Sequence, residues 1–240
     1  MNEVDERLLR FSKKKIIGCD PINRIGIRVP VLRAELKNYN FFSGLSRGDI
    51  LYRWDQVWKK SPYFESMSLT LYAYQGKNLN NEETNTIITW VERCTCWEHS
   101  DDLSKIYAQI LEEHPDWILN KYKKWNKSKE LWKRRQSVVG LLEYSSKRKK
   151  ILPFTDLIKF VTPLLNDSEY YVQKGIGWTL REIFNAYPDK TLKYFKQNLL
   201  EISPVAYSAG TKKIDKTIKL NFNRERKNNR KKKRSIKVNK

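Results

Sequence analysis

The sequence predicts an all-α protein, built as an α-solenoid of about six antiparallel helix pairs with a basic concave groove. Two observations indicate this fold. Apolar residues recur at helical spacing, while clear alternating strand patterns are missing beyond the N-terminal region. In addition, residues 116–144 resemble residues 156–184, and similarity after a shift of forty residues is typical of stacked helix pairs.

Polar segments separate the expected helices in order along the chain. They are QGKNLNNEE, EEHPDW, NKSKE, RKKILPFTD, LLNDSEY and AYPDK. Such segments start and stop helices, because their side chains cap free backbone groups or their backbones cannot continue a helix. The run Asn81-Glu82-Glu83 is one predicted helix start, with acidic residues directly after an asparagine.

Each of the two related segments predicts a helix, a short polar turn and a second helix. The turn is an Asn-x-Ser sequence in both, beginning at Asn126 in the first segment and at Asn166 in the second. A period near forty residues with two helices is the signature of HEAT-like repeats, whose concave face binds extended partners. We therefore expect one HEAT-like domain over residues 1–215, with more degenerate repeats in its earlier part.

The stretch KGIGWTLREIF, residues 174–184, predicts the second helix of such a pair. Its apolar stripe, expected to pack against the core, is Ile176, Leu180 and Ile183. Lys174, Trp178 and Arg181 share another stripe, although Trp178 aligns with Val138 in the repeat and could be buried in the same way. The two glycines each cost a helix about 1 kcal/mol relative to alanine. They indicate a close approach by a neighbouring helix or by a bound partner.

The chain carries a formal net charge of +21, much of it near the C-terminal end. Residues 219–240 contain eleven Lys or Arg residues and one Glu, so the remainder is basic as well. We expect residues 216–240 to form a disordered, Lys/Arg-rich tail. This distribution indicates a polyanionic partner, nucleic acid before an acidic membrane surface, and the alternative for the tail is a solvated end without a partner.

Composition argues against several classes of site and location. With only two histidines, the three cysteines, Cys19, Cys94 and Cys96, do not complete a zinc site, and their odd number fits a reduced chain. The sequence lacks a P-loop and a GxSxG elbow, so an enzyme of this kind would work without a metal or a nucleotide cofactor. Neither a run of eighteen apolar residues nor an apolar signal region occurs. We expect a cytoplasmic monomer without a membrane partner.

Two local patterns in the first half of the chain combine cationic, aromatic and acidic side chains. RIGIRVPVLR is a turn-like stretch before a helix and carries Arg28 and Arg33. CWEHSDDLSK places Trp97 and Asp101 four residues apart, which puts them on one helical face. The ordinary structural interpretation of Asp101 is a first-turn acid that complements the helix dipole.

Two further patterns follow in the second half. WKRRQSVVGLLEY opens an apolar helix with Arg134 and Arg135, and KGIGWTLREIF contains Trp178 and Arg181. Taken singly, each residue has an ordinary interpretation, since tryptophans in helical repeats usually pack in the core and arginines usually lie on the surface or in salt bridges. No single one of them requires a functional site.

Together and in this order, RIGIRVPVLR, Trp-x-x-x-Asp, Trp-x-x-Arg and KxIGWxLRE resemble the DNA alkylation repair enzyme family, the HEAT-like-repeat alkylpurine DNA glycosylases. The resemblance covers roughly residues 20–210, and KGIGWTLRE is its most specific part. It implies a basic groove that clasps duplex DNA and an enzyme that excises positively charged N3- or N7-alkylated purines. It also implies that no cofactor is needed and that the lesion need not be flipped into a pocket.

The resemblance implies roles for individual residues. Asp101 would be the catalytic carboxylate, and Trp97 and Trp178 would form the aromatic wall around the lesion. Arg135 would hold the DNA backbone beside the lesion, and Arg181 would contact phosphate. The further cations that would contact DNA are Lys174, Arg134, Arg28 and Arg33. A protein of this kind would be associated with the nucleoid.

One motif departs from the family pattern. The family usually has Asn-Trp-Asp before the key acid, whereas this chain has Cys96-Trp97-Glu98. Asp102 directly follows Asp101, so the register of the key acid stays open, although the spacing of four favours Asp101.

Two alternatives to the glycosylase follow from the same patterns. A non-catalytic HEAT-like protein that binds DNA or RNA would need Arg135 and Arg181 but not Asp101. A scaffold for protein partners would keep little salt-dependent affinity for nucleic acid once residues 219–240 are removed.

Overall fold

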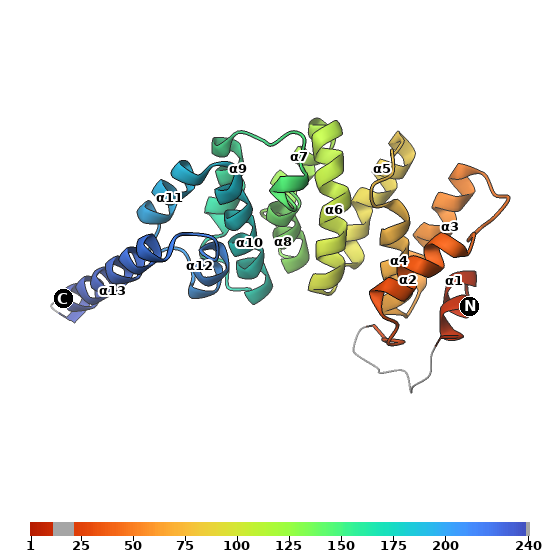
Figure 1. Cartoon of the computed structure of the whole chain (residues 1–240), viewed down its shortest axis with the longest axis horizontal. Helices are drawn as coiled ribbons and strands as arrows, with labels where there is room; N and C mark the ends of the chain where they lie inside the picture. The colour runs from red at the N-terminus through yellow and green to blue at the C-terminus, as the bar shows by residue number, and fades with distance from the viewer. Residues whose placement is uncertain (12–21, 239–240) are drawn as a thin grey trace. The chain divides into compact units, whose positions relative to one another are not determined.

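The structure is a computed structural model that describes the backbone of residues 1–11 and 22–238 and the side chains of residues 1–11 and 22–229. Within these residues the chain forms thirteen α-helices and three short 3-10 helices (Figure 1). The described residues contain no named strand, and their one β-type contact is an isolated bridge between Asn23 and Tyr63. The predicted all-α class is therefore confirmed.

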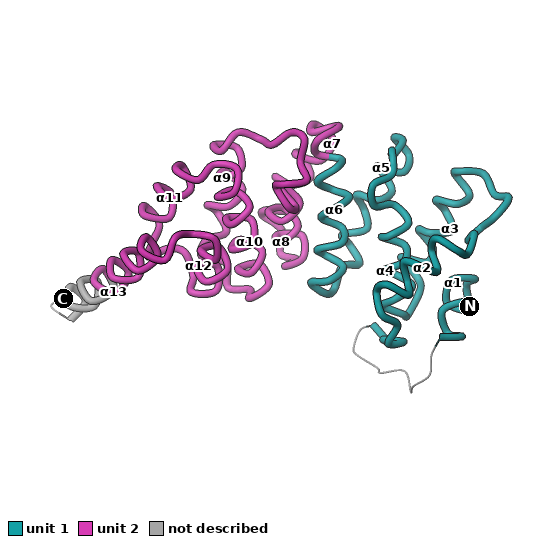
Figure 2. The backbone as a smooth tube through the Cα atoms, in the orientation of Figure 1, with its two compact units in different colours: residues 1–110 teal, residues 111–240 magenta. Residues whose placement is uncertain are grey.

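The chain divides into two compact units, residues 1–110 and residues 111–240 (Figure 2). The division falls inside helix α6, Trp97–Glu113, within the single repeat domain that the sequence predicts over residues 1–215. Each unit has its own buried side chains, so each can be described separately.

Unit 1 is centred on α4, which packs against α1, α2 and α3. Its helices are α1 Glu3–Leu9, α2 Val29–Asn38, α3 Arg47–Lys60, α4 Phe64–Tyr74, α5 Asn81–Ile88, η1 Thr89–Arg93 and most of α6. Trp58 and Trp90 stack in the core with ring centroids 5.7 Å apart. The Trp58 indole N–H donates to the Trp90 carbonyl, and the Trp90 indole N–H donates to Asp55 Oδ1. Because each indole N–H has a hydrogen-bond acceptor, both rings can be buried without leaving a polar atom unpaired.

Helix α5 begins one residue earlier than its acidic run suggested. The side chain of Asn80 accepts from the Glu83 backbone N–H, and the Glu83 carboxylate accepts from the Asn80 backbone N–H in return. This reciprocal capping box satisfies two backbone donors at the helix start. The cap is thus Asn80 rather than Asn81, with Glu83 at the third position of the helix.

Unit 2 contains the two segments that the sequence related by a shift of forty residues. Its helices are α7 Pro115–Trp125, α8 Leu131–Val139, η2 Ser145–Lys147, α9 Phe154–Val161, η3 Thr162–Leu164, α10 Tyr170–Ala186, α11 Pro188–Gln197, α12 Pro204–Gly210 and α13 Lys216–Val238. The pair α7–α8 corresponds to the pair α9–α10 at that shift. Helix α10 packs against both α8 and α12.

The two glycines of α10 face these two neighbouring helices. A Cβ atom on Gly175 would lie 3.2 Å from Nη1 of Arg135 in α8, and one on Gly177 would lie 2.6 Å from the carbonyl oxygen of Ala206 in α12. The second distance is shorter than real Cβ contacts allow. Of the two explanations that the sequence left open, close helix packing accounts for both glycines.

Residues 216–238 are helical, whereas the sequence predicted a disordered tail over residues 216–240. Asp215 starts this helix, because its Oδ1 accepts from the backbone N–H groups of Thr217 at 2.8 Å and Ile218 at 3.3 Å. These hydrogen bonds lower the pKa of Asp215. Phe222 and Arg226 are buried against unit 2, which gives the helix an inward face despite its high charge. Residues 239–240 lie outside the described part.

Candidate nucleic-acid interface

Trp97 and Asp101 lie at the start of α6 in unit 1. Helix α6 begins at Trp97, whose side chain is 47% exposed, and Asp101 follows one turn later as a half-buried residue. A spacing of four residues places both on the same side of the helix. The helix therefore presents an accessible indole next to a carboxylate.

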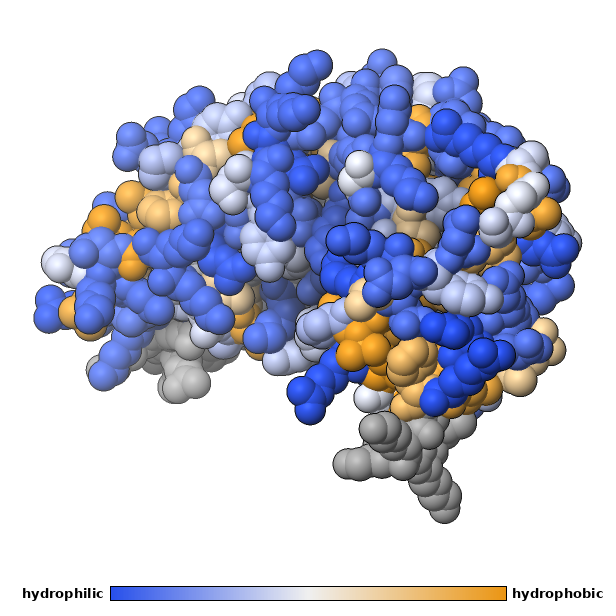
Figure 3. All heavy atoms as spheres, turned by 45° about the vertical axis from the view of Figure 1, so that its right-hand side comes forward, coloured by the Kyte–Doolittle hydropathy of each residue, from blue (hydrophilic) through white to orange (hydrophobic). Residues whose placement is uncertain are grey.

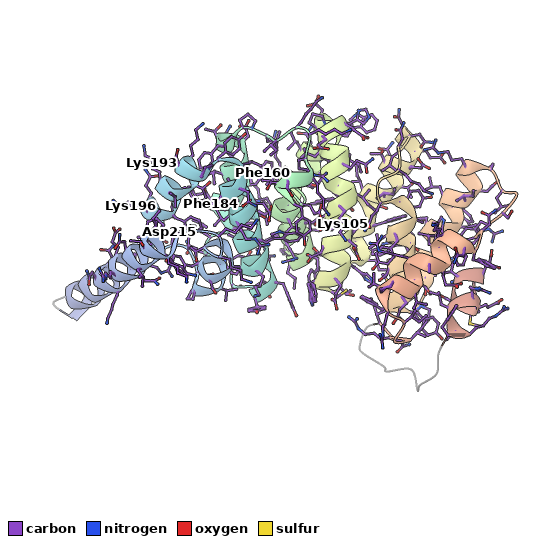
Figure 4. The ribbon with its side chains drawn as sticks, viewed as in Figure 1. Lys105, Phe160, Phe184, Lys193, Lys196 and Asp215 are labelled. Carbon is purple, nitrogen blue, oxygen red and sulfur yellow. The ribbon has the colours of Figure 1, made fainter. Side chains whose placement is uncertain are left out.

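Asp102 is held by its own neighbours. Its Oδ1 accepts from Nζ of Lys105 at 2.6 Å and from Nε2 of Gln75 at 3.2 Å, and the residue is 9% exposed. Gln75 also accepts from the guanidinium of Arg33, at 3.3 Å, and Arg33 lies 4.2 Å from the ring centroid of Tyr72. Lys105 is labelled on α6 in Figure 4. Helices α2, α4 and α6 thus bring together a predicted DNA-contact residue and the second acid of the motif.

Residues 24–28, RIGIR, contact the start of α6 and helix α4. Nη2 of Arg24 donates to Oε1 of Glu98 at 2.8 Å, and the same guanidinium lies 3.8 Å from the centroid of the Phe64 ring. The backbone N–H groups of Ile25 and Gly26 donate to the two oxygens of the buried Glu65 carboxylate, at 2.9 and 2.7 Å. Glycine suits this turn, because residue 26 has a φ of 89°. Arg28, further along the stretch, is exposed.

His99 packs beneath the exposed residues of α6. It is fully buried, its ring stacks on Phe64 at 4.3 Å, and its Nε2 lies 3.1 Å from the Ser68 hydroxyl and 3.2 Å from the Phe64 carbonyl. Burial lowers the pKa of His99 to about 3, so the ring is neutral at physiological pH. His99 is therefore a packing residue that fixes the first turn of α6.

The buried neutral His99 predicts a loss of stability at mildly acidic pH. An unfolded histidine titrates near 6.5, so between pH 6.5 and pH 3 the unfolded state binds a proton that the folded state does not. The contribution of the neutral His99 to the free energy of unfolding is therefore present above pH 6.5 and falls as the pH decreases from 6.5 to 3. Urea unfolding should give a free energy of unfolding lower by roughly 1–2 kcal/mol at pH 5 than at pH 7.

The matched variants for this titration are His99→Gln and His114→Asn. His114 is exposed and stacks on Trp117. Its replacement should therefore leave the difference in the free energy of unfolding between pH 7 and pH 5 unchanged. His99→Gln should remove most of it. An unchanged difference between pH 7 and pH 5 in His99→Gln would contradict this assignment.

In unit 2, Trp178 and Arg181 lie on the less buried side of α10. Trp178 is half-buried, whereas its repeat equivalent Val138 is fully buried. The Trp178 ring meets Tyr144 edge to face at 5.5 Å, and its buried indole N–H has no hydrogen-bond partner among the described residues. The Arg181 side chain is 22% exposed and contacts Glu182, and Lys174 is exposed one turn before Trp178. The apolar stripe behind them is fully buried, as predicted: Ile176, Leu180 and Ile183.

The two arginines of the Trp-x-x-Arg motif are engaged inside unit 2. Arg135 is 3% exposed, and its Nη1 donates to the Tyr171 carbonyl at 2.6 Å between α8 and α10. Arg134 makes a two-point contact with Asp167, at 2.6 and 3.3 Å, and also donates to two backbone carbonyls. The sequence interpretation placed both on DNA. In the structure, their guanidinium groups are instead used in holding helices and turns of unit 2 together.

A buried carboxylate positions Tyr144 beside Trp178. Oε2 of Glu182 accepts from the backbone N–H and the hydroxyl of Ser145, at 3.0 and 2.9 Å, and from Nδ2 of Asn185 at 3.0 Å. Tyr144 has a φ of 45°, an unusual left-handed conformation for an aromatic residue, and it is 42% exposed. The Glu182 hydrogen bonds hold the chain directly after this strained residue.

Replacing Glu182 by glutamine should destabilise the protein by about 1–3 kcal/mol, since a buried amide cannot accept all three of these hydrogen bonds. Urea unfolding measures the change. Glu169→Gln is the matched control. Glu169 is exposed just before the same helix, so this substitution should leave the free energy of unfolding unchanged. Equal stability of the two variants would show that the Glu182 contacts contribute little.

A model of the DNA alkylation repair enzyme family matches residues 6–214. The chain belongs to this family. The matched range includes every candidate residue named above and ends before α13 begins.

Three solved structures have a similar fold. A protein named "Predicted DNA alkylation repair enzyme from Enterococcus faecalis" matches with a TM-score of 0.63 and 17% identity, over 81% of this chain and 90% of its own. AlkD2 from Streptococcus mutans matches with a TM-score of 0.59 and 17% identity, over 89% of this chain and 100% of its own. The protein smu.31 from Streptococcus mutans UA159 matches with a TM-score of 0.57 and 18% identity, over 78% of this chain and 92% of its own. A comparison with curated proteins finds no match.

Two absences hold for the residues that the structure describes. Among these residues, no group of three or more His, Cys, Asp or Glu side chains could hold a metal ion. None of their helices combines the length and the apolar character needed to cross a membrane.

Tyr144 and Glu182 are residues that sequence reasoning missed in this family member. Tyr144 falls opposite Phe184 at the shift of forty residues, and this position in the repeat does not by itself indicate a functional role. Glu182 follows Arg181 inside KGIGWTLREIF and has no sequence signal of its own. A tyrosine at the end of a repeat, followed by two serines, was the available sign of a turn.

Proposed function

We propose that this protein is a DNA glycosylase that excises positively charged N3- or N7-alkylated purines from duplex DNA. We further propose that its helix pairs form an α-solenoid of HEAT-like repeats with a basic concave groove. Membership of the DNA alkylation repair enzyme family supports DNA as the substrate. The observation that carries the activity is the exposed Trp97 one helical turn from Asp101 at the start of α6.

The chemistry needs a carboxylate and aromatic surfaces rather than a cofactor. An N3- or N7-alkylated purine is cationic, so its glycosidic bond breaks with the electron pair leaving on the base, which becomes neutral. The sugar becomes oxocarbenium-like, and a nearby carboxylate stabilises that charge until water adds at C1′ and loses a proton. We assign the carboxylate to Asp101, because it lies one helical turn from Trp97 and is less buried than Asp102, which is 9% exposed.

Trp97 and Trp178 are proposed to contact the alkylated base. An indole face attracts a cationic base by about 0.5–2 kcal/mol. The exposed ring of Trp97 and the half-buried ring of Trp178 are both suited to this contact.

Phosphate contacts are assigned to cations that solvent can reach. These are Arg28, Arg33 and Lys174, which are exposed, and Arg181, which is partly exposed. Hydrophilic side chains cover most of the face drawn in Figure 3. We propose that Arg135 is a positioning residue, because it joins α8 to α10 instead of facing solvent.

The second candidate function is DNA binding without catalysis. The burial of Arg135 favours it, because the cation expected to hold the backbone beside a lesion is used for internal packing here. The sequence Cys96-Trp97-Glu98, where the family usually has Asn-Trp-Asp, also favours binding without catalysis.

One assay separates the two functions. Duplex DNA treated with a methylating agent is incubated with the full-length protein, and released bases are quantified by chromatography. A glycosylase releases 7-methylguanine or 3-methyladenine. Binding of the same duplex without release of either base would overturn the enzymatic proposal in favour of the second candidate.

A further inference from the structure

Helix α13 lies beyond the part of the chain that matches the family, and its composition differs from the rest of unit 2. The helix runs over Lys216–Val238, whereas the family match ends at residue 214. Its sequence, KTIKLNFNRERKNNRKKKRSIKV, has one acidic residue among many Lys and Arg residues. A function for this helix therefore has to come from its own residues and contacts.

The start of α13 is docked on unit 2 through one face. Phe222 is 6% exposed, and its ring lies 6.4 Å from the ring of Phe195 in α11. One turn later Arg226, also 6% exposed, donates from Nη2 to the Ile202 carbonyl at 3.1 Å, and its guanidinium lies 4.3 Å from the Tyr207 ring centroid. The spacing of four residues makes this a continuous inward stripe. The helix is thus held in place instead of trailing as a free charged tail.

The Tyr207 hydroxyl adds a third anchor. It donates to Oδ1 of Asn223 at 2.9 Å. Together with the cap from Asp215, these contacts fix the first half of α13 along its length.

The outward face of the same helix segment is cationic. Lys216, Arg224 and Lys227 are exposed, and the exposed large apolar residue in this segment is Leu220. Helix α11, which contributes Phe195 to the docking contact, also carries exposed lysines: Lys190, Lys193 and Lys196. Figure 4 shows Lys193 and Lys196 on α11 and Asp215 before α13. A surface of this kind attracts a polyanion more strongly than it attracts lipid, because a membrane-binding helix needs a broad exposed apolar face.

We propose that the outward face of α13, with the exposed lysines of α11, is a docked cationic surface that binds the phosphates of duplex DNA without regard to sequence or damage. The choice of DNA as the partner rests on the proposed function. A helix of 23 residues is about 35 Å long, close to one turn of B-form DNA at about 34 Å. Docking places the charges before binding, so less side-chain and backbone freedom is lost in the complex.

The test separates a docked surface from a flexible charged tail by keeping the charge constant. In the full-length protein, Phe222→Ala removes the docking contact, and Leu220→Ala is the control with an exposed apolar residue in the same helix. A third variant, Arg224→Gln with Lys227→Gln, removes two outward charges. Thermal unfolding confirms that each variant is folded, and hydrogen exchange of residues 216–229 reports whether α13 is docked.

Binding is measured by fluorescence anisotropy with an undamaged 20-base-pair duplex at several salt concentrations. We expect Phe222→Ala to weaken binding by about threefold to tenfold without a change in charge, and Leu220→Ala to bind as the wild type does. Arg224→Gln with Lys227→Gln should reduce the slope of log Kd against log salt by about 1–2.

Several results would overturn the proposal. Wild-type affinity of a Phe222→Ala variant whose amides have lost protection would show that docking is irrelevant. An unchanged salt slope after removal of both outward charges would show that this face does not contact phosphates. Tighter binding of an RNA duplex than of a DNA duplex would assign the surface to RNA. Because the probe is undamaged, these results do not depend on whether the protein excises bases.

Discussion

Asp101→Asn is expected to lower the rate of base release by about 100-fold or more, the usual cost of removing a group that stabilises developing charge in an active site. The substitution keeps the size of the side chain but removes the negative charge that the proposed mechanism places beside the oxocarbenium-like sugar. The rate should be measured in single turnover with excess protein on a duplex that contains one 7-methylguanine. Affinity for the same duplex should change little, since the carboxylate acts on the transition state.

The control for this variant is Asp102→Asn. It breaks the ion pair with Lys105 and so can alter stability, but under our assignment it leaves the chemical step intact. A normal rate for Asp101→Asn together with a large loss for Asp102→Asn would move the catalytic role to Asp102. Normal rates for both variants would remove the carboxylate from the mechanism.

Gly177→Ala is expected to destabilise the protein by about 2 kcal/mol or more, the cost of overpacking a rigid contact. The new Cβ would lie 2.6 Å from the carbonyl oxygen of Ala206 and equally close to Cβ of Ala209, so α12 would have to move away from α10. The loss exceeds the gain of about 1 kcal/mol in helix propensity that alanine brings. Urea unfolding measures the net effect.

Gly48→Ala is the matched control for this substitution. Gly48 is also helical, in α3, but the nearest atom to its added Cβ is 3.9 Å away and belongs to a flexible glutamate side chain. Alanine at this position should be neutral or slightly stabilising. If the two variants had the same stability, close packing would not be the reason for Gly177.

The repeat could be predicted from the sequence because its signals are local. Turn residues at Asn126 and Asn166, and the buried stripe of α10, depend on spacing along the chain, and the structure confirms the helix pairs at that shift. The two glycines of α10 are also a local signal, since glycine is unfavourable inside a helix. Which partner approaches them was not predictable, because that depends on α8 and α12, which contact α10 only in the folded chain.

The candidate site was harder to predict, because a motif does not specify the exposure of its side chains. Trp178 and its repeat partner Val138 differ in burial, and Arg135 proved to be internal although its sequence context resembles a DNA contact. The helical state of residues 216–238 was also missed. Its net charge predicted disorder, but one aromatic residue, Phe222, and a cap at Asp215 anchor the segment on unit 2.

The contact between α10 and α12 has a consequence for how related chains can diverge. Gly177 faces Ala206 and Ala209, and Gly210 faces the Gly177 carbonyl at 3.3 Å from its own added Cβ, so the two backbones nearly touch. A larger residue at position 177 would meet backbone atoms of Ala206 as well as Cβ of Ala209, so loss of that methyl group alone would not make room for it. We therefore expect these positions to evolve as a coupled set, in which a gain in volume on one helix is accepted only after the helices have separated.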